Sequence, residues 1–202
     1  MLVLGDCFGW GLGVEQPQRF SELLEQRHPG WEIVNASVIG YGTDQELLYL
    51  KEKGLALKPD VVLLLFCDND FENNTHAEQY LYFKPYFTVA GGALQLHNVP
   101  VPKSNIKQRL TRFLIGRTYL GSRLRAAKDF VLNLRPPPGS RNRGPDDKPA
   151  GGPADSAELT ARLVAAVQAV CRQNGVAFVL VSIPLPAEER TILQQVADAQ
   201  KF

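Results

Sequence analysis

Residues 1–14, MLVLGDCFGWGLGV, join a short apolar run to a glycine-rich turn that carries Asp6 and Cys7. The apolar run, residues 1–4, predicts a β-strand, and the turn places both polar side chains at the carboxyl end of that strand. In an open α/β sheet, ligands bind at this edge. Glycine has no Cβ, so the backbone of such a turn can approach a ligand closely. The stretch therefore predicts a site at the first strand-to-helix turn.

Two other interpretations of the turn are open at this point. A nucleotide-binding loop needs glycines spaced as Gly-x-Gly-x-x-Gly, or a Gly-Lys-Ser/Thr sequence, and residues 9–13, GWGLG, have neither. The turn could also be a tight structural connection with Cys7 buried beneath it. Taken alone, the turn favours this structural interpretation, so the choice depends on what the rest of the chain places beside it.

The composition is that of an ordinary globular domain, with 202 residues, 45% hydrophobic and 21% charged side chains, and a net charge of +1. The charge balance gives no reason to expect a nucleic-acid partner. Three cysteines without a CxxC pair or a His/Cys cluster predict neither a disulfide framework nor a metal site, and we expect no cofactor. The sequence shows neither a membrane span nor a signal peptide. Localisation is left open, including an envelope-associated, extracytoplasmic one if an amino-terminal anchor lies outside this chain.

Four strand-like apolar runs alternate with helix-like segments, which predicts an α/β fold with a parallel sheet. The third run, residues 60–66 (DVVLLLF), is apolar throughout, as is typical of a central strand buried on both faces. We expect one domain over residues 1–202, a three-layer αβα sandwich with the flavodoxin-like strand order 2-1-3-4. The expected strands are residues 1–4, 31–34, 60–66 and 176–183, and the expected helices are residues 17–28, 43–58, 156–174 and 187–200.

Residues 76–155 interrupt this pattern after the third strand, and we expect them to form an insertion. Alternating aromatic residues followed by Gly91-Gly92 predict a hairpin in its first part. Residues 103–134 predict a basic helix, and residues 135–155 have the composition of a flexible linker. Eleven of the 22 Lys and Arg residues lie in residues 103–143. The basic helix is therefore either a solvated face or a lid that contacts a membrane peripherally.

Three short blocks resemble the signature of the SGNH/GDSL hydrolase superfamily. Gly5-Asp6-Cys7 stands where that family has Gly-Asp-Ser, Gly40 in VIGYGTDQ stands at the second block, and Asn69 in CDND stands at the third. The wording of the second and third blocks resembles a bacterial subgroup that is often tethered at the cell envelope. The resemblance implies hydrolysis of acyl ester or thioester bonds, with a small acylated molecule or an acylated glycan as substrate.

The resemblance also implies a role for each block. Cys7 occupies the nucleophile position, and its backbone N–H, the Gly40 N–H and the Asn69 side-chain amide would stabilise the oxyanion. Asp6 and Asp70 would support these residues, with Asp6 mainly structural. His76 is the histidine that could border the site as a base, although the default for such a residue is a solvated loop position.

The chain departs from the family pattern in two ways. Cysteine replaces serine at position 7, which favours a thioester or activated ester as the bond attacked, and a nearby helix N-terminus would favour the thiolate of Cys7. The Asp-x-x-His block and the fifth strand that precedes it in the family are missing from the sequence. We therefore expect a hydrolase that is C-terminally truncated or catalytically weakened. Two alternatives stay open, an envelope O-acyltransferase and a non-catalytic binding module of the same fold.

Cys67 follows the third expected strand directly. If the first and third strands are neighbours, Cys7 and Cys67 end side by side, about 4.8 Å apart, and a disulfide between them is within reach. The alternative is that Cys67 simply packs beneath the third block.

Overall fold

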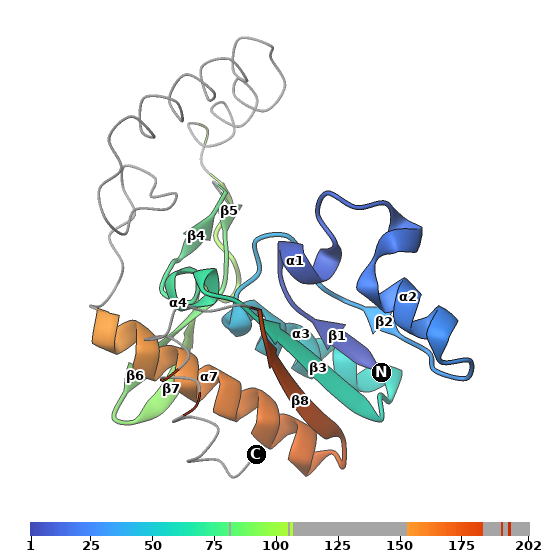
Figure 1. Cartoon of the computed structure of the whole chain (residues 1–202). Coiled ribbons are helices and arrows are strands. Elements are labelled where there is room, and N and C mark those ends of the chain that lie inside the picture. Colours follow the sequence, from blue (N-terminus) through green and yellow to red (C-terminus); the bar gives the residue numbers. More distant parts are fainter. Residues whose placement is uncertain (81, 105, 107–152, 184–190, 192–193, 195–202) are drawn as a thin grey trace.

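The computed structural model describes residues 1–80, 82–104, 106, 153–183, 191 and 194 (Figure 1). Its central sheet has four parallel strands in the order β2-β1-β3-β8. These strands are β1 (Leu2–Leu4), β2 (Val34–Asn35), β3 (Val61–Phe66) and β8 (Ala177–Ser182). The predicted α/β fold, the strand order 2-1-3-4 and the insertion after the third strand are thus confirmed.

The register of the sheet brings the carboxyl ends of its strands to one edge. Leu4 of β1 lies opposite Leu64 of β3, and Phe66, the last residue of β3, lies opposite Ser182 of β8. β3 occupies the centre of the sheet, and Phe66 is fully buried, as its uninterrupted apolar sequence predicted. The turns that follow β1 and β3 therefore emerge next to each other.

Two helices, α3 (Thr43–Glu52) and α7 (Pro153–Gln173), pack against each other on one face of the sheet (Figure 1). α2 (Phe20–Arg27) lies beside β2. Side chains alternate between the two faces of a strand, so only every second residue of β1 and β3 joins the core beneath these helices. That core includes Leu2, Leu4, Leu47, Leu50, Val62, Leu64, Phe66, Leu163, Val164 and Val167.

Two local predictions were wrong in detail. The second strand is shorter than residues 31–34 and shifted to Val34–Asn35. The helix expected over residues 43–58 is shorter, because α3 ends at Glu52 and a separate 3-10 helix, Gly54–Leu57, follows it. The turn after β3 continues as a short helix, α4 (Asn69–Asn73). The N–H of Asn74 donates to the Asp70 carbonyl at 3.0 Å and closes this turn.

The described part of the insertion contains two hairpins. β4 (Glu78–Gln79) pairs with β5 (Tyr82–Phe83), and β6 (Tyr86–Ala90) pairs with β7 (Ala93–His97). Gly91 and Gly92 join β6 to β7 with φ values of 58° and 79°, which confirms the predicted hairpin.

Other parts of the predicted insertion cannot be compared with the structure. The basic helix, the linker and the last helix (103–134, 135–155 and 187–200) lie almost entirely outside the described residues. Within the described part of the chain, no helix is both long enough and apolar enough to cross a membrane.

Candidate active site

The turn after β1 holds Cys7 at the carboxyl edge of the sheet. Asp6 caps the short helix α1 (Cys7–Trp10), because its Oδ1 accepts a hydrogen bond from the Phe8 N–H at 2.9 Å. Gly9 brings this helix close to the sheet, where an added Cβ would lie 2.4 Å from the Oγ of Ser37. The local sequence therefore fixes Cys7, half-buried, at the first helical position.

The carboxylate of Asp6 joins the first and third sequence blocks. Its Oδ2 accepts a hydrogen bond from the Asn69 Nδ2 at 3.0 Å, and the thiol sulfurs of Cys7 and Cys67 each lie 3.6 Å from the same oxygen. Asp6 is only 2% exposed, so the Phe8 N–H, the Asn69 amide and the Cys7 thiol replace the water that a buried carboxylate would otherwise need. The contacts of Asp6 are those of a structural residue that ties the turn after β1 to the turn after β3.

The orientation of the Asn69 amide follows from its two partners. A carboxylate only accepts hydrogen bonds, so Nδ2 faces Asp6, and Oδ1 accepts from the Cys67 thiol. An amide nitrogen carries two hydrogens, and Asp6 takes one of them. Among the described residues the other hydrogen has no acceptor, so it can meet a further one.

Gly40 carries the second block into the same region. It is buried and has a φ of 82°, a left-handed conformation that favours glycine. The Gly40 N–H donates no hydrogen bond to the part of the chain that the structure describes. The ring of Tyr80 lies directly on Gly40, since an added Cβ would be 2.4 Å from Cε2 and 2.9 Å from Cδ2 of that ring.

The resting form of Cys7 is a thiol rather than a thiolate. Burial, followed by the neighbouring Asp6 carboxylate, raises the pKa of the Cys7 thiol above its ordinary value. The backbone N–H groups of Cys7 and Phe8, at the start of α1, favour the thiolate as expected, but burial and the Asp6 carboxylate outweigh them. Burial and the charges of Asp70 and Asp6 raise the pKa of the Cys67 thiol as well.

Cys7 and Cys67 are brought together as the strand order predicted, and both are free thiols. Cys67 is 2% exposed and donates to Asn69, so it packs beneath the third block. A disulfide between the two cysteines stays a prediction.

None of the three histidines of the chain hydrogen-bonds to the Cys7 thiol, whose partner is Asp6. His76, expected by default to be solvated, is 6% exposed, and its Nε2 has no hydrogen-bond partner among the described residues. The ring of His97 stacks on Tyr86 with the ring centroids 5.1 Å apart, whereas His28 stacks on a tryptophan beside α2. In the described structure, these contacts leave Cys7 without an imidazole base.

Residues 3–199 match the model of the GDSL-like lipase/acylhydrolase family. This chain belongs to that family. The family is part of the SGNH superfamily, and membership implies an ester hydrolase that acts on ester substrates. The comparison with curated proteins gives no match.

This acylhydrolase has a group of buried carboxyl groups behind its candidate site. Asp44, Glu46 and Asp70 are each at most 2% exposed, and the Lys84 ammonium forms an ion pair with Asp44. Burial raises the pKa of Asp44 to about 6 and raises those of Glu46 and Asp70 well above their ordinary values. Neither carboxyl oxygen of Glu46 has a hydrogen-bond partner in the described residues, so Glu46 is expected to be protonated at neutral pH. The described residues form no metal-binding group.

Glu46→Gln is expected to stabilise the acylhydrolase at pH 8 and to change little at pH 4. The folded state keeps the proton of Glu46 at a pH where the unfolded chain has lost it, so wild-type stability falls as pH rises above about 4.5. Glutamine mimics the protonated form and removes this dependence. Urea unfolding at several pH values measures the effect, with Glu52→Gln at an exposed position of the same helix as control. Equal responses of the two variants would contradict the protonated state of Glu46.

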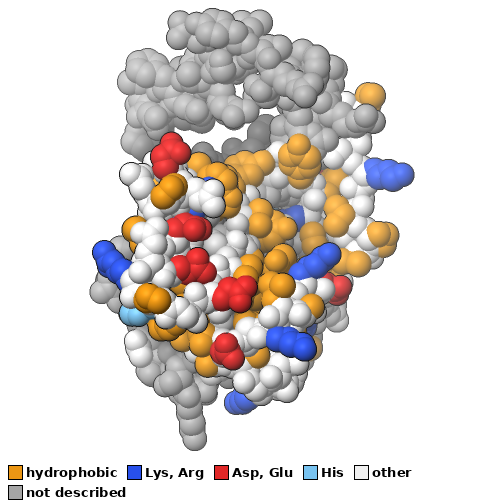
Figure 2. Space-filling model, turned by 90° about the vertical axis from the view of Figure 1, so that its right-hand side faces the viewer, with side chains coloured by type: hydrophobic (Ala, Val, Ile, Leu, Met, Phe, Trp, Pro, Cys, Tyr) orange, Lys and Arg blue, Asp and Glu red, His pale blue; other side chains and the backbone are white. Residues whose placement is uncertain are grey.

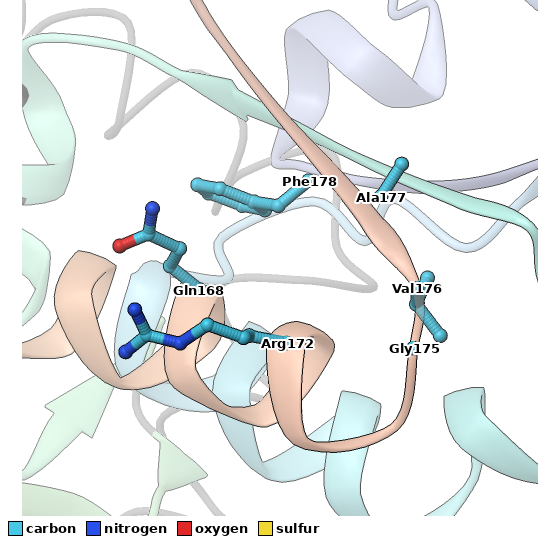
Figure 3. A pocket seen from close by; sticks show the side chains of 6 residues that line it. All are labelled: Gln168, Arg172, Gly175, Val176, Ala177 and Phe178. Carbon is cyan, nitrogen blue, oxygen red and sulfur yellow. The ribbon is translucent and has the colours of Figure 1, made fainter. Parts of the chain in front are cut away.

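A pocket of the acylhydrolase lies away from these residues. It is lined by Gln168, Arg172, Gly175, Val176, Ala177 and Phe178 (Figure 3). Ala177 is the first residue of β8, so this pocket is at the amino edge of the sheet, opposite the turn that holds Cys7. It is therefore separate from the candidate active site.

Exposed apolar side chains come from the turns of the first two blocks and from the β4–β5 hairpin. They are Phe8 and Leu12 near Cys7, Val38 and Ile39 before Gly40, and Tyr80, with exposed fractions of 37–62%. Figure 2 shows hydrophobic side chains gathered across the upper part of the described surface, beside a group of acidic side chains. The surroundings of the candidate site of this acylhydrolase are thus apolar.

Proposed function

We propose that this chain hydrolyses acyl esters through Cys7, with thioesters and activated esters as its best substrates. The observation that carries the proposal is the position of Asp6, whose one carboxylate oxygen contacts the Cys7 sulfur and the Asn69 amide. This contact joins the proposed nucleophile and the proposed oxyanion donor, which begin the short helices after the adjacent strands β1 and β3.

The reaction proceeds in two displacements. The Cys7 thiolate attacks the carbonyl carbon, and the negative charge that develops on the carbonyl oxygen is stabilised by the N–H groups of Cys7 and Gly40 and by the Asn69 amide. The Cys7 thiol loses its proton to solvent, and the new C–S bond gives a tetrahedral intermediate. The bond to the leaving alcohol or thiol then breaks, and that group takes a proton from solvent. Water then attacks the thioester on Cys7, which releases the acid and restores the thiol.

The cysteine sets the preference for the leaving group. A thiolate leaves a tetrahedral intermediate more readily than an alkoxide does, so attack on a plain alkyl ester mostly reverses. The thiolate of a thioester or the phenolate of an aryl ester leaves the tetrahedral intermediate about as readily as Cys7 does, so the reaction can go forward. The raised pKa of the Cys7 thiol and the lack of an imidazole partner make the enzyme slow at neutral pH.

The exposed apolar side chains near Cys7 and Gly40 favour substrates with a longer acyl chain. Phe8, Ile39 and Tyr80 expose apolar surface near Cys7 and Gly40. An alkyl chain that packed against them would bury this surface, which is favourable. We therefore expect butyryl and longer acyl groups to be better substrates than acetyl. Contact of the basic helix, residues 103–134, with a membrane stays a separate proposal, since this segment lies mostly outside the described residues.

Asn69→Ala is expected to lower kcat about 10²–10³-fold on a p-nitrophenyl ester or a thioester, because one oxyanion donor is lost. Initial rates measured at fixed pH test this, and Asn174→Ala provides a matched control at an exposed position beyond α7. Thermal unfolding of both variants shows whether the fold is kept.

The outcomes separate the candidate functions. No hydrolysis by the wild-type protein on any ester favours the binding module instead. Transfer of an acetyl group to a sugar acceptor faster than to water favours the O-acyltransferase.

A further inference from the structure

We propose that Tyr80 is a catalytic residue of this site, whose hydroxyl donates a hydrogen bond to the oxyanion formed at Cys7. This inference rests on the proposed ester hydrolysis and adds a donor that none of the three blocks contains. It assigns a role to the first hairpin of the insertion.

The position of Tyr80 is imposed by the fold. It follows β4 directly, at the tip of the β4–β5 hairpin, and its φ of 50° is left-handed. A bulky residue rarely adopts this conformation, and such strain is concentrated at functional sites. The preceding Gln79 anchors the hairpin to α4 by donating from Nε2 to the Asn73 Oδ1 at 3.1 Å.

The ring of Tyr80 covers the second block. An added Cβ on Gly40 would lie 2.4 Å from Tyr80 Cε2, so only glycine at position 40 leaves space for the ring. The ring therefore packs on Gly40, whose N–H has no acceptor among the described residues. The Tyr80 ring therefore borders Gly40, whose N–H would stabilise the oxyanion.

The Tyr80 hydroxyl is carried by the ring carbon next to Cε2, the atom that lies against Gly40, so the hydroxyl belongs to the edge of the ring beside the second block. Burial, then the charges of Cys7 and Asp6, raise the pKa of the Tyr80 phenol. The phenol is therefore protonated throughout the range in which Cys7 acts, and it is a donor and not an anion. The side chain is nevertheless 62% exposed, so an incoming substrate can meet the hydroxyl without displacing the core.

Tyr80→Phe keeps the aromatic ring on Gly40 and removes only the hydroxyl that would donate to the oxyanion. We expect kcat on p-nitrophenyl butyrate to fall about 10²-fold, with KM changed less than about twofold, as for loss of an oxyanion donor. Tyr82→Phe is the matched control, because Tyr82 is 59% exposed on the same hairpin and lies in β5. Equal kinetics for the two variants would overturn the role of Tyr80.

A second measurement tests the position of the hydroxyl without using hydrolysis. In protein with ¹³C-labelled tyrosine, the Tyr80 resonance is identified by its loss in Tyr80→Phe and titrated by NMR. Cys7→Ala is expected to lower the titration midpoint of Tyr80 and to leave that of Tyr82 unchanged, since the Cys7 charge raises the pKa of Tyr80.

The two measurements distinguish the possible failures. An unshifted Tyr80 midpoint places the hydroxyl away from Cys7 and overturns the inference, even if ester hydrolysis is intact. A wild-type protein that hydrolyses no ester overturns the proposed function and the catalytic role together, whatever the midpoint does.

Discussion

Replacing Cys7 by alanine is expected to lower ester hydrolysis by about 10³-fold or more, to the level given by binding and the oxyanion donors alone. The thiol is the only described nucleophile at the carboxyl edge whose side chain contacts Asp6, apart from Cys67, which is buried beneath Asn69. Hydrolysis of a p-nitrophenyl ester by purified wild-type and variant proteins measures the loss. A variant that keeps most of its activity would show that the bond is attacked by another group.

The pH dependence of the wild-type rate provides a further test of the same residue. Because burial and Asp6 raise the pKa of the Cys7 thiol, the rate should climb with pH through neutrality and not level off near pH 7. Cys7→Ser tests whether any base can activate a hydroxyl at this position. A serine at this position would have Asp6 and no imidazole as its neighbour, so it should be as inactive as the alanine variant. A serine variant faster than wild type would require a base that the described contacts do not provide.

Lys84→Met is expected to lower the free energy of unfolding by about 3–5 kcal/mol at pH 8. Lys84 is 3% exposed and forms its ion pair with Asp44, which is 0% exposed, so the variant leaves a buried carboxylate without a cation. The loss should shrink toward pH 5. The pKa of Asp44 is already about 6 with the lysine present, and without it the carboxyl group protonates more readily.

Urea unfolding at both pH values measures this effect. Arg162→Met is the matched control, because Arg162 forms an exposed i,i+4 ion pair with Glu158 and its removal should change stability by less than about 1 kcal/mol. Adding Asp44→Asn to Lys84→Met should recover much of the loss at pH 8. No recovery would mean that Lys84 acts through packing and not through its charge.

Much of this arrangement could be predicted from the sequence because it follows from strand topology. The uninterrupted apolar run of β3 indicated the central strand, and parallel strands end at one edge. That was enough to predict that Cys7, Asn69 and Cys67 would lie together. The structure adds the atom they share, the Oδ2 of Asp6.

The remaining features depend on contacts between distant parts of the chain. Tyr80 meets Gly40 and Lys84 meets Asp44, each across about forty residues, and no local pattern indicates such pairs. The raised pKa of Cys7 depends on the position of one neighbouring carboxylate and on burial, which the turn sequence leaves undetermined. The roles assigned to the site residues stay predictions until the variants are measured.

The Lys84–Asp44 pair also limits how this chain could be shortened by design. Lys84 lies between β5 and β6, so the inserted segment supplies the cation for a carboxylate that belongs to α3. Deleting the hairpins to obtain a minimal domain would leave the buried Asp44 carboxylate without its cation. The insertion and the sheet therefore depend on each other for stability, and a shortened version would need a neutral residue at position 44 from the outset.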